Sequence, residues 1–391
     1  MMRALALAAR GLYTTDPNPR VGCVLVRAGD TLGEGWHERA GGPHAEVAAL
    51  RAAQGDVRGA TAYVTLEPCS HTGRTPPCAD ALIAAGIRRV VCSSVDPNPK
   101  VAGNGIKRLE AAGISVSVGE LACEARALNP GFFSRFERSR PWIRLKLAMS
   151  LDARTAPARG EKPREDLRGP MWISGETSRA DVQHWRARSS CVLTGAGTVR
   201  SDDPRLDVRL AYGPWVRQPL RVLLDPALTC APGARIFADG HALVFAAERA
   251  APAAALGARS PPVGVECVPA DGHRLDLKAV IARLMEREVN EILVECGPRL
   301  AAAFIDEDLV DELIVYMAPI LLGADAPPLT ALKGQPGKGS VAPGAVARFD
   351  IASVDRMDAD LRLVLTPRHD APSAPASCMA TPAGQPAGRN L

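Results

Sequence analysis

The 391-residue sequence has few aromatic residues and no excess of charge of either sign. Aromatics make up 4% of the chain, and 47 Lys and Arg are balanced by 43 Asp and Glu, which leaves a formal net charge of +4. Proteins that bind single-stranded nucleic acid need basic grooves and aromatic stacking platforms. The composition therefore predicts no nucleic-acid partner, and the balance of charge predicts no strong attraction to an anionic membrane.

Long hydrophobic runs are also absent. The most apolar stretch, residues 313–323, contains Pro319 and is shorter than the roughly 20 residues that cross a bilayer. The apolar part of residues 1–10 is too short for a signal peptide. We therefore expect a cytoplasmic protein without a membrane partner.

Cysteine is too sparse for a disulfide scaffold of this length. There are ten cysteines, and most stand singly in apolar, strand-like runs, which predicts buried thiols. Only Cys69 and Cys78 lie in a polar segment rich in Gly and Pro. A loop of that kind is able to present metal ligands.

Short β-branched runs alternate with Ala- and Leu-rich stretches in both halves of the chain, a pattern that predicts two α/β domains. We place the boundary where Pro141 interrupts a polar, helix-like segment, so that residues 1–140 form one domain and residues 141–366 the other. The first is expected to be three-layered, with a mostly parallel sheet whose first two strands form a hairpin. Residues 367–391, rich in Ala, Pro, Ser and Gly without a hydrophobic period, are expected to be a disordered tail.

A candidate zinc site lies in the first domain. His44 and Glu46 open an expected helix, Cys69 follows an expected strand, and Cys78 follows two prolines. One imidazole and two thiolates are three ligands, which leave the fourth position of a zinc ion open to water, as in catalytic sites. Glu46, two residues from a ligand, is then placed to act as the general acid and base.

This pattern is close to the H-x-E and P-C-x-x-C signature of zinc nucleobase deaminases, but eight residues rather than two separate the cysteines. A closed structural zinc site is the alternative. It would need a fourth ligand, for which His37 and His71 are the nearby candidates.

Several further motifs point to one enzyme family. They are DPNPRVG at 16–22, PHAE at 43–46, TLEPCSH at 65–71, GRTPPC at 73–78, DPNP at 96–99 and VAG at 101–103. With these motifs the sequence resembles the bifunctional deaminase/reductases of riboflavin biosynthesis, from about residue 3 to residue 366. The longer cysteine spacing is typical of that family.

The resemblance implies a cytidine-deaminase-like α/β/α domain that hydrolyses the 2-amino group of a diaminopyrimidinone ribosyl phosphate. By position, His44, Cys69 and Cys78 would hold Zn²⁺ and Glu46 would move protons. Asn18 would contact the pyrimidine, since an amide offers a donor and an acceptor to a flat heterocycle. A plain Asn-Pro turn is the alternative reading of Asn18.

The resemblance also implies a second domain, similar to dihydrofolate reductase, that uses NADPH to reduce the ribosyl group to ribityl. Its motifs here are KLAMSLD at 146–152, WIS at 172–174, LTGAGTVRSDDP at 193–204 and ECGP at 295–298. The residues that would contact NADPH by position are Ala148, Trp172, Thr198, Asp202, Gly297, Pro298, Arg299, Leu300, Ala301, Ala302 and Ala303. Those that would face the substrate are Arg186, Leu206, Arg209 and Glu295.

Two glycine turns, at residues 195–197 and at Gly297, each follow an expected strand. The turn at Gly297 begins a helix whose free N–H groups suit a phosphate. Arg186 and Arg209 suit a sugar phosphate through bidentate hydrogen bonds. The alternative for the two glycine turns is ordinary loop geometry. The alternative for the two arginines is a surface salt bridge.

Two features depart from the family. The charged segment 159–169, an expected exposed loop, is longer than usual, and Pro170 and Pro226 stand where the family often has hydroxyl residues.

The resemblance therefore implies a two-step enzyme that acts on a small phosphorylated pyrimidine, and we expect a homo-oligomer. The alternatives to this enzyme are a zinc-stabilised RNA-binding or RNA-editing protein, and a protein in which only one domain is active.

Overall fold

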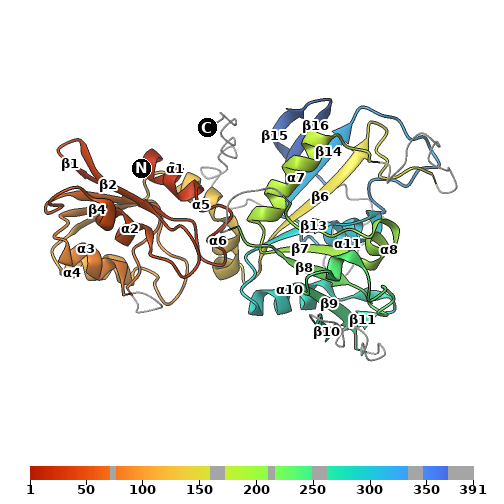
Figure 1. Cartoon of the computed structure of the whole chain (residues 1–391), viewed down its shortest axis with the longest axis horizontal. Coiled ribbons are helices and arrows are strands. Elements are labelled where there is room, and N and C mark those ends of the chain that lie inside the picture. Colours follow the sequence, from red (N-terminus) through yellow and green to blue (C-terminus); the bar gives the residue numbers. More distant parts are fainter. Residues whose placement is uncertain (71–75, 159–171, 210–215, 249–261, 333–346, 369–391) are drawn as a thin grey trace. The chain divides into compact units, whose positions relative to one another are not determined.

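The computed structural model describes residues 1–70, 76–158, 172–209, 216–248, 262–332 and 347–368. The chain divides into two compact units (Figure 1). Among the described residues, the first unit contains residues 1–140 with residues 216 and 217, and the second contains the others from Pro141 onward. The predicted loop at 159–169 and Pro170 lie outside the described residues, as do residues 369–391 of the predicted tail. The tail prediction is wrong at its first two residues, because Pro367 ends a strand over Asp360–Pro367 and the N–H of Arg368 donates to the carbonyl oxygen of Arg348 at 2.8 Å. Within the described residues, no helix has the length and apolar character that a membrane crossing requires.

The first unit contains a five-stranded sheet in the order β2-β1-β3-β4-β5. Its strands are β1 (Gly22–Arg27), β2 (Asp30–Trp36), β3 (Thr61–Val64), β4 (Arg89–Cys92) and β5 (Ser115–Val118). The β1–β2 hairpin is confirmed, but the sheet is not mostly parallel: β1 is antiparallel to β2 and β3, and only β3–β4 and β4–β5 are parallel. The reason is that the hairpin inserts β1 between β2 and β3, two strands that run in the same direction.

Helices cover both faces of this sheet, which confirms the three-layer prediction. They are α1 (Met2–Ala9), α2 (Ala45–Ala52), α3 (Cys78–Ala84), α4 (Asn104–Ala111), α5 (Ala122–Leu128) and α6 (Pro130–Glu137). Alternate residues of β1 divide between the layers: Cys23 and Leu25 pack with α2, α3 and α4, whereas Val24 packs with α1. This alternation is the two-residue period of a strand buried on both faces.

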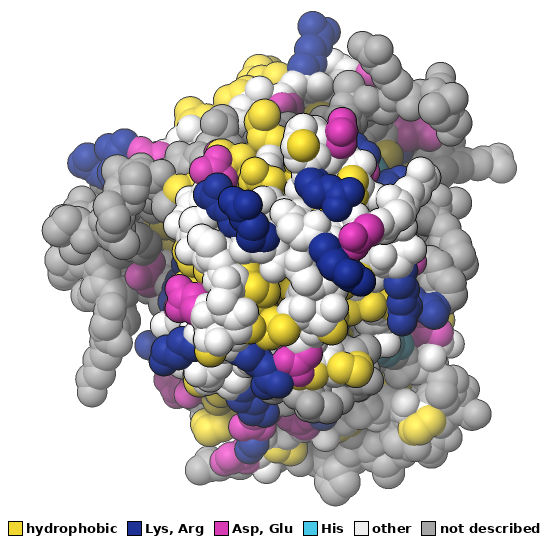
Figure 2. All heavy atoms as spheres, turned by 90° about the vertical axis from the view of Figure 1, so that its left-hand side faces the viewer, with side chains coloured by type: hydrophobic (Ala, Val, Ile, Leu, Met, Phe, Trp, Pro, Cys, Tyr) yellow, Lys and Arg dark blue, Asp and Glu magenta, His cyan; other side chains and the backbone are white. Residues whose placement is uncertain are grey.

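Figure 2 shows one face of the first unit, where Lys and Arg side chains lie among Asp and Glu side chains and apolar groups. One ion pair of this unit joins Arg108 of α4 to Asp80 of α3. Charges of both signs are therefore interspersed on the face in this view.

The second unit contains a nine-stranded sheet in the order β10-β9-β8-β7-β13-β6-β14-β16-β15. Its strands are β6 (Trp142–Ser150), β7 (Cys191–Gly195), β8 (Leu220–Leu224), β9 (Ala242–Ala247), β10 (Gly264–Val268), β13 (Glu291–Glu295), β14 (Glu312–Ala318), β15 (Phe349–Met357) and β16 (Asp360–Pro367). All neighbouring pairs from β10 to β14 are parallel, and only the β14–β16 and β16–β15 pairs are antiparallel. The carboxyl ends of the parallel strands therefore lie along one edge, where ligands of α/β sheets bind.

Helices also pack against this second sheet. They are α7 (Glu176–Arg188), α8 (Ala196–Asp202), α10 (Leu277–Glu286), α11 (Pro298–Asp306) and a 3₁₀ turn at Arg235–Phe237, and a small hairpin joins β11 (Ala270–Asp271) to β12 (Arg274–Leu275). The main core combines Ile143, Leu193 and Ile292 of three adjacent strands with Leu284 of α10 and Phe304 of α11. The α/β class predicted for both halves is confirmed.

Candidate active sites

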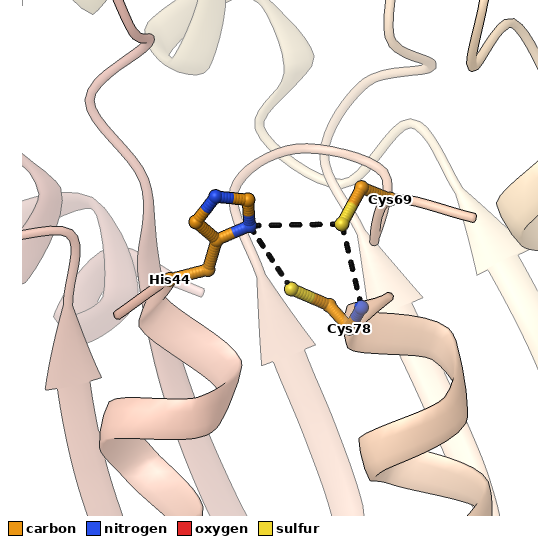
Figure 3. A group of neighbouring side chains, drawn as sticks. All are labelled: His44, Cys69 and Cys78. Carbon is orange, nitrogen blue, oxygen red and sulfur yellow. Dashed lines mark hydrogen bonds between the residues drawn. The ribbon is translucent and has the colours of Figure 1, made fainter. Parts of the chain in front are cut away.

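The three predicted metal ligands of the first unit converge on one point. The Nδ1 atom of His44 lies 3.1 Å from Sγ of Cys78 and 3.6 Å from Sγ of Cys69, and the three ligand atoms lie within 4.8 Å of one another. Figure 3 shows the imidazole and both sulfurs pointing toward one another. A tetrahedral zinc ion requires nitrogen-to-sulfur separations of roughly 3.6 Å, so these donors fit zinc with small adjustments.

The local fold explains this convergence. His44 is the N-cap residue of α2, Cys78 is the first residue of α3, and Cys69 lies in the loop after β3. Helix α2 packs directly on β2: a Cβ atom on Gly35 would lie 2.3 Å from the backbone nitrogen of Ala49, so no larger residue fits there. The sheet thus brings two helix starts and one strand end to the same place.

Hydrogen bonds within this group distinguish the two sulfurs. Sγ of Cys69 accepts from the backbone N–H of Cys78 at 3.3 Å. A hydrogen bond from the Cys78 thiol lowers the pKa of Cys69, and that same hydrogen bond raises the pKa of Cys78. The hydrogen bond to Cys69 also raises the pKa of His44. These hydrogen bonds favour a thiolate at Cys69, the form that binds zinc.

Glu46 lies in the first turn of α2, and only 3% of its surface is exposed. Burial raises the pKa of its carboxyl group to about 7, although the neighbouring His44 opposes this shift. The carboxyl group also interacts with the Cys78 thiol. A carboxyl group that titrates near neutrality beside a metal site is suited both to accept and to donate a proton.

The two candidates for a fourth ligand differ in status. His37 is buried, and both of its ring nitrogens have other partners: Nδ1 lies 2.9 Å from the carbonyl oxygen of Pro43 and Nε2 lies 3.1 Å from Nδ2 of Asn18. His71 lies outside the described residues. Within the described part of the chain, the potential metal-binding group contains three residues, as an open catalytic site requires.

His37 also fixes the orientation of Asn18. A carbonyl oxygen only accepts, so Nδ1 of His37 carries the proton and donates to Pro43. Burial lowers the pKa of His37, which favours the neutral ring with a lone pair on Nε2. The amide N–H of Asn18 then donates to Nε2, and the amide oxygen of Asn18 is left for another partner.

In the second unit, Arg186 and Glu295 form a buried ion pair. Nε and Nη2 of Arg186 donate to the two carboxylate oxygens at 2.6 and 2.9 Å, and Nη1 donates to the carbonyl oxygen of Asp207 at 3.2 Å. Burial alone would raise the pKa of Glu295, but the guanidinium of Arg186 outweighs it and the pKa is lowered. Arg209 and Lys146 also interact electrostatically with this carboxylate.

Lys146 was not among the residues given a role from the sequence. Desolvation lowers its pKa, and Glu295 opposes that shift. The signal in the sequence is a lysine inside the apolar strand β6, where an unpaired ammonium would be unfavourable.

The other two predicted substrate residues are presented differently. Arg209 is exposed, and its backbone N–H donates to Oε1 of Gln183 at 3.0 Å. The side chain of Leu206 is 3% exposed and packs in a core with Val192 and Leu223, while its backbone takes a positive φ of 54°. Contact between Leu206 and a ligand would therefore involve backbone atoms.

The two glycine turns lie against each other at the carboxyl ends of β7 and β13. A Cβ atom on Gly195 would lie 3.2 Å from Leu300, and one on Gly297 would lie 4.0 Å from Oγ1 of Thr198. Asp202 is exposed one turn after Thr198 on α8, where residues four apart share a face. The structure thus brings Thr198, Gly297 and Leu300 together.

The start of α11 offers backbone groups rather than side chains. Its first N–H to donate within the helix is that of Ala301, to the carbonyl oxygen of Gly297, and Pro298 has no N–H. The N–H groups of Arg299 and Leu300 therefore point out of the helix end. The side chains of Ala301 and Ala302 are buried and that of Ala303 is partly buried against the core, so none of the three offers a freely exposed side chain.

The remaining predicted NADPH contacts lie on separate elements. Ala148 of β6 pairs with Tyr316 of β14 and packs near Val182 of α7. Trp172 is 62% exposed, with its ring centre 5.1 Å from the guanidinium carbon of Arg179. Pro226, one of the departures from the family, follows β8 and accepts from the N–H of Ala247 at 3.0 Å.

Two family models match the chain. Residues 1–94 match the cytidine and deoxycytidylate deaminase zinc-binding region, and residues 141–363 match the RibD C-terminal domain. The riboflavin biosynthesis protein RibD of Escherichia coli K12 is 49% identical over 346 residues, which cover 85% of this chain and 90% of that protein. The chain belongs to the RibD family of bifunctional riboflavin-biosynthesis deaminase/reductases.

Further relatives support this membership across both units. RibD of Haemophilus influenzae is 43% identical, over 94% of this chain and 96% of its own. A solved structure of RibD from Acinetobacter baumannii superposes with a TM-score of 0.83 at 41% identity, covering 94% of this chain and 98% of that one. The deaminase/reductase of Thermotoga maritima gives 0.79 at 34% identity, covering 94% and 97%.

The predicted family, its two activities and its two cofactors are therefore confirmed: a RibD enzyme deaminates with zinc and reduces with NADPH. The RNA-binding alternative and the reading with a single active domain do not fit this family.

Proposed function

We propose that the first unit hydrolyses the 2-amino group of 2,5-diamino-6-(5-phosphoribosylamino)pyrimidin-4-one, and that the second unit reduces the ribosyl side chain of the product to ribityl. In the first unit, His44, Cys69 and Cys78 would hold zinc beside Glu46. The observation that carries this proposal is the convergence of one nitrogen and two sulfurs at the start of the helix that buries Glu46.

Zinc, when bound, supplies a Lewis acid that lowers the pKa of water at its open position. The carboxylate of Glu46 takes a proton from the attacking water as a new C–O bond forms at C2 of the pyrimidine and the electron pair of the ring C2=N bond moves to the ring nitrogen. Protonated Glu46 then donates to the 2-amino nitrogen as its C–N bond breaks and the ring C2=N bond re-forms, so that ammonia leaves and the carboxylate is restored. The pKa of about 7 suits both transfers.

Asn18 would bind the pyrimidine through its amide oxygen. Because His37 takes a hydrogen bond from the amide nitrogen, the oxygen is the group that remains to accept from an N–H of the substrate. This interaction would select a heterocycle that presents a donor at that edge.

In the second unit we propose that Arg209, rather than Arg186, is the main phosphate ligand. The fork of Arg186 formed by Nε and Nη2 is already occupied by Glu295, whereas the Arg209 side chain is 58% exposed and only loosely paired with Asp207, at 3.6 Å. Arg186 would instead hold Glu295 in place against the sugar, with Leu206 contributing backbone atoms.

NADPH would lie along the carboxyl edge of β6, β7 and β13. Thr198 and Asp202 of α8 and the backbone N–H groups of Arg299 and Leu300 would bind its polar groups, and Ala148 and Trp172 would contact its rings. The sheet edge then places the nicotinamide against the sugar carbon that receives the hydride. The domain limits at 140 and 366, the cytoplasmic location and a homo-oligomeric state belong to the same proposal.

Separate substitutions test the assignment. Glu46→Ala should stop ammonia release from the diaminopyrimidinone phosphate and leave NADPH oxidation on the deaminated substrate unchanged. Glu295→Ala should do the reverse. Loss of both activities in a folded protein with either change would contradict two separate sites.

A further inference from the structure

Glu67 is a buried carboxylate of the first unit that has no part in the proposed chemistry. Its side chain accepts hydrogen bonds from four backbone N–H groups. Oε2 accepts from Asp96 at 3.2 Å and from Gly103 at 2.9 Å, and Oε1 accepts from Gly105 at 2.9 Å and from Ile106 at 3.3 Å. These donors include the start of α4 and the preceding loop, which holds the DPNP and VAG motifs.

No ion pair of Glu67 with Lys or Arg is present within the described residues, although the residue is only 4% exposed. The backbone donors and the positive end of α4 take the place of a counter-ion. Among side chains of this size, only a carboxylate offers acceptor sites for four donors while bringing no donor of its own. The site therefore requires glutamate rather than glutamine.

The backbone around Glu67 is packed as closely as its hydrogen bonds imply. A Cβ atom on Gly105 would lie 1.9 Å from the carbonyl oxygen of Pro68, so α4 can approach this loop only with glycine there. The N–H of Glu67 donates to the carbonyl oxygen of Ser94 at 2.9 Å. The backbone N–H of Glu67 thus holds Ser94, and its side chain holds the 96–106 segment that follows.

Cys69 lies two residues beyond Glu67 in this loop. Its carbonyl oxygen accepts from the N–H of Ala79 at 3.1 Å, and its sulfur accepts from the N–H of Cys78 at 3.3 Å. The loop that carries Cys69 is therefore held by α3 on one side and, through Glu67, by α4 on the other.

We propose that Glu67 is a positioning residue of the deaminase site, which locks the 96–106 segment to the Cys69 loop so that zinc binding and the order of this segment depend on each other. This inference rests on the proposed role of Cys69 as a zinc ligand. By linkage, any change that frees the segment weakens zinc binding, and removal of zinc loosens the segment to the same extent.

Glu67→Gln in the full-length enzyme is the first test. Glutamine keeps the shape but turns an amide NH₂ toward two of the four N–H groups. Zinc release to a chromogenic chelator should become about tenfold faster, the magnitude typical of lost support around a metal ligand. The visible spectrum of the cobalt-substituted enzyme should also shift, because the geometry at Cys69 changes.

Val90→Ala is the matched control. Val90 is fully buried in β4 of the same sheet and is not a neighbour of the ligands in sequence. It should lower the unfolding temperature and leave both the rate of zinc release and the cobalt spectrum unchanged. Glu67→Gln with a wild-type release rate and spectrum, or Val90→Ala with the same changes as Glu67→Gln, would overturn the inference.

Hydrogen exchange on the wild-type enzyme tests the same coupling if Glu67→Gln does not fold. The amides of Gly103, Gly105 and Ile106 should exchange slowly with zinc bound and much faster after its removal. The amide of Arg20, which donates to Oδ1 of Asn129 at 2.7 Å elsewhere in this unit, should change less. Equal changes at all four amides would contradict the coupling. A wild-type enzyme that contains no zinc would instead defeat the proposed function.

Discussion

The two sites differ in how their charges are balanced. At the deaminase site, one imidazole nitrogen and two sulfurs, all of them metal-ligand atoms, converge on one point, so a cation is the natural partner for the group. At the reductase site, Glu295 is already neutralised by Arg186 through two short hydrogen bonds. The first site requires a metal ion. In the second site, the charged protein groups already neutralise one another, so no metal ion is needed.

Metal removal should give the largest difference between the two activities. A chelator should abolish ammonia release, because the protein groups alone cannot activate water, and added zinc should restore it. NADPH oxidation on the deaminated substrate should not change, since Arg186 and Glu295 need no metal. Parallel loss of both rates would show that the two sites do not differ in this way.

Glu46→Gln should lower the rate of deamination about 10³-fold, because an amide cannot take up and return a proton. Zinc content should stay at the wild-type level, since Glu46 is not expected to be a ligand. Metal analysis beside an ammonia assay checks both points. Glu110→Gln, an exposed glutamate on α4, is the control and should change neither quantity.

Glu295→Leu should destabilise the second unit by about 3 kcal/mol or more, because it leaves the buried guanidinium of Arg186 without its partner. Arg186→Met combined with Glu295→Leu should recover much of this loss while still lacking reductase activity. Denaturant unfolding measures the stability of the single and the double variant, and deaminase activity serves as the control for the first unit. If the double variant is no more stable than the single one, the unpaired guanidinium of Arg186 is not the cause of the lost stability.

Acid should have a smaller effect on the same pair. The pKa of Glu295 is lowered in the folded chain, so its ion pair stabilises the second unit above the ordinary glutamate range, and this contribution is lost as the pH falls through the lowered pKa. The unfolding temperature of the second unit should fall on acidification. The part of this fall that comes from Glu295 should be missing from the double variant. An identical pH profile for the wild type and the double variant would argue against this contribution.

Much of the fold follows from local pattern. The apolar run that predicts β1 and the helix-length Ala-rich runs that predict α2 and α10 are confirmed, because β1 is buried on both faces of its sheet and each of the two helices buries one apolar face. The sequence does not predict α8, which follows a glycine turn, or β15, whose nine residues are all at least partly exposed. An element without a buried face carries no clear hydrophobic period.

The candidate sites differ in the same respect. His44, Glu46, Cys69 and Cys78 were found because metal ligation demands particular residue types at short spacing. The sequence gives no role to Lys146 and assigns Arg186 to a phosphate, because their partner, Glu295, is distant in sequence. Lys146 meets Glu295 across the adjacent strands β6 and β13, and Arg186 reaches it from helix α7.

The sequence by itself determined which residues are able to bind a metal and to transfer a proton, since those properties belong to the side chains. Only the tertiary structure decided which groups are already satisfied: the fork of Arg186 by Glu295, the side chain of Leu206 by the core, and both ring nitrogens of His37 by Asn18 and Pro43. Hydrogen bonding and burial depend on neighbours that the chain brings together only when it folds, so no single segment specifies them.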